Sequence, residues 1–150
     1  MFWLYRAAWN TGLTAAKREE WTPAAVCFSA CARLISFFFT AAENGTTVDK
    51  TTEAFRSYQL RNVSAMLLTG ACLLEICKVQ CRAAAGDPTA PPRNTQGLVA
   101  QARSALAKQQ QTVDALLAVD VDVVHESILL TTLRNHGFVL QHELSCLSGD

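Results

Sequence analysis

Two residues near the C-terminus combine side chains that nucleophilic catalysis and metal binding both use. His142 and Cys146 are four residues apart, so on a helix they share a face. An imidazole beside a thiol could activate a nucleophile or hold a metal ion. The pair lies in the terminal region, where helices fray. The pairs His125–Glu126 and His142–Glu143 are adjacent in sequence, and neighbouring helix residues point apart. We therefore interpret these residues as a solvated helix end and predict neither a catalytic nor a metal site.

The thiols of the chain are the second group of residues with chemistry. The six cysteines are Cys27, Cys31, Cys72, Cys77, Cys81 and Cys146. Cys27/Cys31 and Cys77/Cys81 form two C-x3-C pairs. This arrangement resembles the paired C-x3-C helices of small chaperones of the mitochondrial intermembrane space, in which disulfides join two helices. The resemblance covers these four residues, and 45 residues separate the two pairs here, whereas that family keeps its hairpin short. We expect reduced, buried thiols in a reducing, cytoplasmic compartment, and the spacing disfavours zinc.

Motifs and charge exclude several further classes of function. The sequence contains no Gly-rich phosphate loop after a strand, no HExxH and no GxSxG, which are the patterns of nucleotide binding, zinc proteolysis and ester hydrolysis. Lys plus Arg equals Asp plus Glu, 13 of each, whereas nucleic-acid binders carry a basic excess. The sequence therefore predicts no enzyme, no cofactor and no nucleic-acid partner.

The first element to consider is an apolar stretch over residues 24–42. Residues 24–42 contain one charge, Arg33, and are long enough to cross a bilayer. Their polar residues recur at spacings of four and three and so form one narrow stripe on a helix: Ser29, Arg33, Ser36, Thr40 and Glu43. A stripe of this kind is typical of a bundle helix with one edge in water. We predict a buried bundle helix over residues 23–43.

The rest of the chain also favours helices. Residues 2–18 form an amphipathic pattern without an acidic residue, and the first acid of the chain is Glu19. We interpret this segment as an ordinary first helix, and a mitochondrial targeting or membrane-anchoring segment is the alternative. Residues 50–84 predict a long helix broken near 62–70, with 65–74 in the deepest core. Residues 85–97 are rich in Pro and Gly and predict a loop.

Two further helices are expected after this loop, over 96–118 and 123–147, with a kink at His136–Gly137 in the second. The alternating stretch 118–124 is interpreted as a turn, and an edge strand that pairs with a partner is the alternative. The sequence therefore predicts an all-α fold, a single domain over residues 1–150 with about five helices.

A helical bundle without catalytic motifs favours a non-enzymatic interaction module, an adaptor or an assembly subunit, acting on another protein or on a second copy of itself. Half of the residues are hydrophobic, so we expect an apolar groove or face. The residues expected to take part are Phe2, Trp3, Trp9, Phe37, Phe38 and Phe39. One alternative is a mitochondrial or other organelle membrane protein, anchored by residues 1–20 and inserted through 24–42. Another is an apolar-ligand or lipid carrier lined by Phe37, Phe38 and Phe39.

Overall fold

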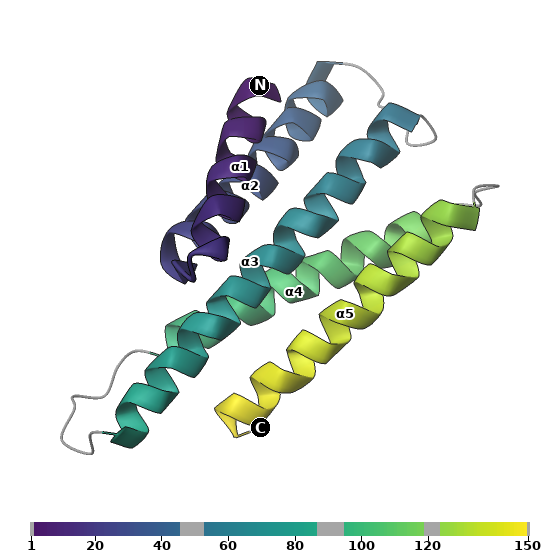
Figure 1. Cartoon of the computed structure of the whole chain (residues 1–150). Coiled ribbons are helices and arrows are strands. Elements are labelled where there is room, and N and C mark those ends of the chain that lie inside the picture. The colour runs from purple at the N-terminus through teal and green to yellow at the C-terminus, as the bar shows by residue number, and fades with distance from the viewer. Residues whose placement is uncertain (1, 46–52, 87–94, 119–123, 150) are drawn as a thin grey trace.

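The computed structural model describes residues 2–45, 53–86, 95–118 and 124–149, and within these ranges the chain forms five helices and no strand (Figure 1). The helices are α1 (Phe2–Lys17), α2 (Trp21–Gly45), α3 (Glu53–Gly86), α4 (Thr95–Ala118) and α5 (Val124–Ser148). The predicted all-α bundle of about five helices is confirmed. The greater part of the predicted loop 85–97 and of the stretch 118–124 lies outside the described residues.

The long helix α3 is the centre of the bundle. α2, α4 and α5 all pack against α3, α5 also packs against α4, and α1 lies against α2. Figure 1 shows that α2 and α4 run antiparallel to α3, whereas α5 runs parallel to it. Two ion pairs tie α3 to α5: Arg56 Nε lies 2.9 Å from Glu126 Oε1, and Lys78 Nζ lies 2.8 Å from Glu143 Oε2.

The predicted break in α3 is wrong, because the helix runs without interruption from Glu53 to Gly86. Gly70 suggested a break, but its role is to let α4 approach. A Cβ atom at this position would lie 2.6 Å from Leu106 Cδ2, and the Leu106 side chain is fully buried. The predicted deep core at 65–74 is confirmed, since every residue in this stretch is buried or half-buried.

α2 is less buried than its sequence suggests. One side of the helix packs against its neighbours through Ala24, Phe28, Cys31 and Ile35, whereas Val26 is 63% exposed. Residues 21–40 of α2 and 55–86 of α3 are long and apolar enough to cross a membrane by length and composition alone. More than half of the α3 window is buried inside the bundle, and the core helix of a water-soluble protein meets the same criteria.

Two buried glutamines join α4 to α5. Gln109 Nε2 donates a hydrogen bond of 2.9 Å to the carbonyl oxygen of Leu133, and Gln110 Nε2 donates one of 2.9 Å to that of Arg134. Gln110 Nε2 also lies 3.0 Å from Gln109 Oε1. These amides occupy the space beside Gly137, where a Cβ atom would lie less than 3.0 Å from both side chains. α5 continues as a helix through this point.

Candidate interaction groove between α2, α3 and α4

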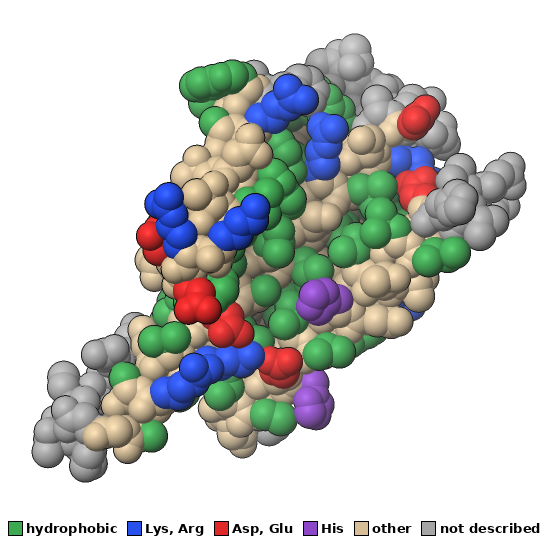
Figure 2. Space-filling view, in the orientation of Figure 1, with side chains coloured by type: hydrophobic (Ala, Val, Ile, Leu, Met, Phe, Trp, Pro, Cys, Tyr) green, Lys and Arg blue, Asp and Glu red, His purple; other side chains and the backbone are tan. Residues whose placement is uncertain are grey.

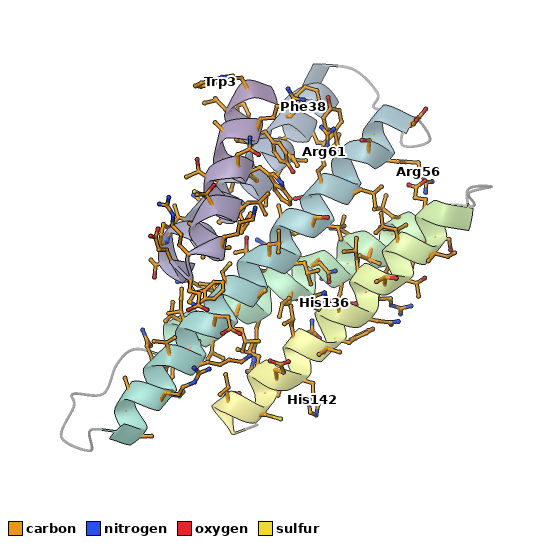
Figure 3. The ribbon with its side chains drawn as sticks, in the orientation of Figure 1. Trp3, Phe38, Arg56, Arg61, His136 and His142 are labelled. Atoms are coloured by element: carbon orange, nitrogen blue, oxygen red, sulfur yellow. The ribbon has the colours of Figure 1, made fainter. Side chains whose placement is uncertain are left out.

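The aromatic residues predicted to interact are distributed over two environments. Trp3 is 76% exposed and Phe37 is 72% exposed, and Figure 3 shows Trp3 at the N-terminal end of α1, pointing away from the bundle. Trp9 packs edge-on against Phe28, with ring centroids 5.4 Å apart. Phe39 is buried. The side chain of Phe2 lies outside the described residues.

Phe38 belongs to an aromatic cluster at one end of the bundle. Its ring centroid lies 5.8 Å from that of Phe39 and 5.6 Å from that of Tyr58, and Phe39 contacts Phe55 at 4.9 Å. This cluster fastens the end of α2 to the start of α3. Of the predicted aromatic residues, those whose side chains the structure describes do not line the groove described next.

A groove with a volume of about 620 Å³ lies between α2 and α4, with α3 as its floor. This volume is within the range of ordinary binding sites. Along α3, the lining residues recur at spacings of four and three over five helical turns: Asn62, Met66, Thr69, Leu73, Ile76 and Gln80. Met66, Thr69 and Leu73 are each less than one-tenth exposed, so the floor is deep.

The two walls of the groove repeat this spacing. The wall formed by α2 contains the small side chains Ala25, Ser29, Ala32 and Ser36. The wall formed by α4 contains Leu98, Gln101, Ala105 and Lys108. Three helices therefore present stripes of residues at a seven-residue repeat to one shared groove, which is the spacing of helix-to-helix seams.

The charged groups of the groove are cations. Arg33 lies on the α2 wall and Lys108 on the α4 wall, and no carboxylate occurs among the described lining residues. The Arg33 guanidinium donates a hydrogen bond of 3.3 Å to Ser29 Oγ. Within the described ranges, neither cation has a carboxylate within salt-bridge distance.

The floor also carries two unpaired acceptors. Asn62 Oδ1 and Gln80 Oε1 are buried, and neither has a hydrogen-bond partner in the part of the chain that the structure describes. They mark the two ends of the α3 stripe. A buried carbonyl oxygen without a donor is costly, by about 1–3 kcal/mol, so these amides favour a ligand that brings hydrogen-bond donors.

Sequence reasoning assigned the polar stripe of α2 to a water-facing edge. The structure places Ser29, Arg33 and Ser36 of that stripe in the groove wall, where Arg33 and Ser36 are exposed, as the prediction of a water-facing edge requires. The polar lining residues of α4, Gln101, Ser104 and Lys108, follow the same three-and-four spacing, whereas those of α3, Asn62, Thr69 and Gln80, are seven and eleven residues apart. Only the tertiary arrangement shows that the three stripes face one another.

The cysteines and histidines form no comparable site. No group of three or more His, Cys, Asp or Glu side chains that could hold a metal occurs among the described residues. All six thiols are free. Burial raises the pKa of the Cys31 and Cys72 thiols to about 11, and it also raises the pKa of Cys77. Cys146 Sγ lies 3.9 Å from His142 Nδ1 on the exposed side of α5.

Thiol reactivity should follow the burial of the side chains. Cys31, Cys72 and Cys77 are buried, Cys27 is half-buried, and Cys81 and Cys146 are exposed. In the folded protein at about pH 8, Cys81 and Cys146 should react with iodoacetamide first and Cys27 more slowly. Cys31 and Cys72 should resist, because the thiolate is the nucleophile and a pKa of about 11 leaves about one thousandth of a thiol ionised at that pH. Cys77 should resist as well, because it is buried and burial raises its pKa. Mass spectrometry of the labelled peptides measures the order, and labelling in guanidinium chloride is the control. Equal labelling of Cys72 and Cys146 in the folded protein would contradict the assignment.

The viewed surface shows no single patch of charge. Figure 2 shows basic and acidic side chains interspersed on this face, with hydrophobic side chains between them.

Comparison of the chain with protein-family models, curated proteins and solved structures found no match. The candidate site therefore stands on its own geometry.

Proposed function

We propose that this chain is a non-enzymatic interaction module, an adaptor or assembly subunit, which receives a segment of a partner protein between α2 and α4. The groove over α3 is the observation that carries the proposal. Its lining mixes apolar side chains with hydroxyl, amide and cationic groups, as protein-recognition surfaces do. A reducing compartment such as the cytoplasm suits the six free thiols, and we propose that location.

The polar groups of the lining favour a polypeptide over a lipid, although most of the lining surface is apolar. More than half of the described lining side chains carry a polar group. An acyl chain would remove these groups from water without returning hydrogen bonds, which is unfavourable for each of them. A polypeptide can supply donors and acceptors together with apolar contacts.

A photo-cross-linking experiment tests this proposal. We would place benzoylphenylalanine at position 26, since Val26 lines the groove and is 63% exposed, and at position 79 as the control, since Val79 is 48% exposed outside the groove. After incubation with extract of the source cells, the variant labelled at position 26 should join to a polypeptide that the variant labelled at position 79 does not capture. That polypeptide, once identified and purified, should bind the unmodified protein. A lipid adduct, or no adduct at position 26, would contradict the proposal.

Membrane association is the second candidate, and two observations favour it. Trp3 and Phe37 are both more than two-thirds exposed, and aromatic side chains suit the membrane interface. Two helices also meet the length and composition criteria for a span. Carbonate extraction separates the candidates, because an inserted protein stays in the pellet and a soluble module is released.

A further inference from the structure

We infer that the groove takes a single amphipathic helix, about five turns long, with carboxylates on both flanks in the half of the groove nearer Asn62. This inference rests on the proposed function and names the partner that the site would recognise. It follows from the spacing of the groove's lining, from the size of the α2 side chains, from the two cations without carboxylate partners and from the two amides of the floor.

The spacing of the lining specifies a helix. α2, α3 and α4 each contribute residues that recur at spacings of three and four. In helical bundles such residues form the holes that receive side chains of a neighbouring helix. A fourth helix laid along the groove would complete a four-helix arrangement around these residues. An extended strand, whose side chains alternate with a period of two, would not match that repeat.

The dimensions agree with this assignment. Asn62 and Gln80 mark the ends of the α3 stripe, and a rise of 1.5 Å per residue places them about 27 Å apart along the helix. A helix of about 18 residues spans the same length. The α2 wall carries Ala25, Ser29, Ala32 and Ser36, and small side chains of this kind let two helix backbones approach closely.

The positions of Arg33 and Lys108 indicate where the partner helix would carry acidic residues. Phe39 contacts Phe55, so the antiparallel register of α2 on α3 puts Arg33 beside the Asn62 end of the floor. Gly70 faces Leu106, so Lys108 lies in the same half of the groove. Each cation is on a different wall, so a helix between them would need a carboxylate on each flank, within the half of the groove nearer Asn62.

The floor amides specify donors on the face that enters the groove. Asn62 Oδ1 and Gln80 Oε1 have no partner within the described residues. The terminal torsion of an amide is broad, so both groups can turn toward an occupant. Ser, Thr, Asn or Gln at the two ends of the helix's inner seam would donate to them, while small or medium apolar residues would fill the space between.

A selection experiment tests the inference without assuming a sequence for the partner. A display library of helical peptides of about 20 residues, randomised at all exposed positions, is selected against the folded protein. The enriched peptides should carry two or more Asp or Glu flanking one half of an apolar seam. Their dissociation constants are then measured by fluorescence anisotropy at low and high salt, and binding should weaken as salt screens the charges.

Charge reversal provides the matched comparison. Arg33→Glu/Lys108→Glu should weaken the selected peptides by about tenfold or more. Arg6→Glu/Lys17→Glu makes the same change of charge on α1, which contributes nothing to the described lining, and should alter binding less than about twofold. Arg33→Ala/Lys108→Ala, expected to weaken binding by a smaller factor, replaces the reversal if circular dichroism shows that the reversed protein does not fold.

The outcomes separate this inference from the proposed function. Enrichment of neutral or basic helices, of peptides without helical period, or of none at all would overturn the acidic helix. The same holds if groove and control reversals weaken binding equally. If the cross-linker at position 26 still captures a polypeptide in those cases, the interaction module stands and only its partner has been assigned wrongly.

Discussion

Replacing Phe28 with alanine should lower the free energy of unfolding by about 4 kcal/mol. Phe28 has no exposed surface and belongs to the main core cluster of the bundle. Its removal deletes a buried ring and leaves a cavity that the surrounding helices can fill only in part. Small domains are stable by about 5–15 kcal/mol, so a large share of the stability should be lost.

The same change should release α1 selectively. α1 packs chiefly on α2, where Trp9 meets Phe28 edge-on and Gly12 lies directly on the Phe28 ring. Without the ring, α1 loses its main anchor while α4 and α5 keep theirs. Hydrogen exchange should therefore quicken in α1 more than in α4, and the emission of Trp9 should shift toward that of a solvated indole.

Phe37→Ala is the matched control, since it makes the same substitution on the same helix at a side chain that is 72% exposed. It should change stability by less than about 0.5 kcal/mol. Urea unfolding followed by circular dichroism measures both variants. Phe28→Leu, which keeps most of the volume, serves if the alanine variant does not fold. Equal losses at positions 28 and 37 would refute this account of the core.

The helices could be predicted from the sequence because helix formation depends on local pattern. The apolar positions of each segment recur with helical period, and Asn44, Gly45 and the prolines of 85–97 mark places where that period stops. These signals do not depend on the tertiary arrangement. For that reason the number and order of the five helices agree with the structure.

Gly70 and Gly137 show what a local sequence pattern does not predict. Gly70 predicted a break and Gly137 predicted a kink, because glycine weakens an isolated helix. In the structure α3 runs through Gly70 without a break. α5 is helical on both sides of Gly137, so the kink there stays a prediction. Each glycine lies where a side chain from α4 approaches. The reason for glycine at these positions is a neighbour more than 25 residues away, which a local pattern does not contain.

A groove was expected, but its position and lining residues could not be predicted, for a related reason. The polar stripe around Arg33 reads as a solvent edge when α2 is considered alone. Its place in a shared groove depends on α2 and α4 flanking α3, and that arrangement is set by core contacts such as the one between Gly70 and Leu106. Val26 is likewise apolar and yet 63% exposed, because the packing of the helices, and not the residue type alone, decides which side chains are buried.

Gly137→Ala should lower the free energy of unfolding by about 3 kcal/mol, although alanine is the better helix former by about 1 kcal/mol. The added methyl group would displace the amides of Gln109 and Gln110. Both side chains are buried, and their hydrogen bonds to the carbonyl oxygens of Leu133 and Arg134 would break. Each buried amide left without a partner costs about 1–3 kcal/mol, which exceeds the gain in helix propensity.

Gly86→Ala is the matched control, because a Cβ atom there meets no other atom within 4 Å. It should leave stability unchanged or raise it by up to about 1 kcal/mol. Thermal and urea unfolding of the two variants measure the difference. Equal effects at the two glycines would show that the space beside Gly137 is not limiting.

A double-mutant cycle identifies the cause of the loss. In a background with Gln109→Ala and Gln110→Ala, the methyl group added at position 137 would no longer displace buried amides, so only the gain in helix propensity should remain. The cost of Gly137→Ala should therefore fall from about 3 kcal/mol to zero or below, a coupling well above the error of additivity for independent sites. If the cost stays the same in both backgrounds, the glycine is required by the backbone of α5. If it vanishes, the two glutamines of α4 explain why α5 carries a glycine in the middle of a continuous helix.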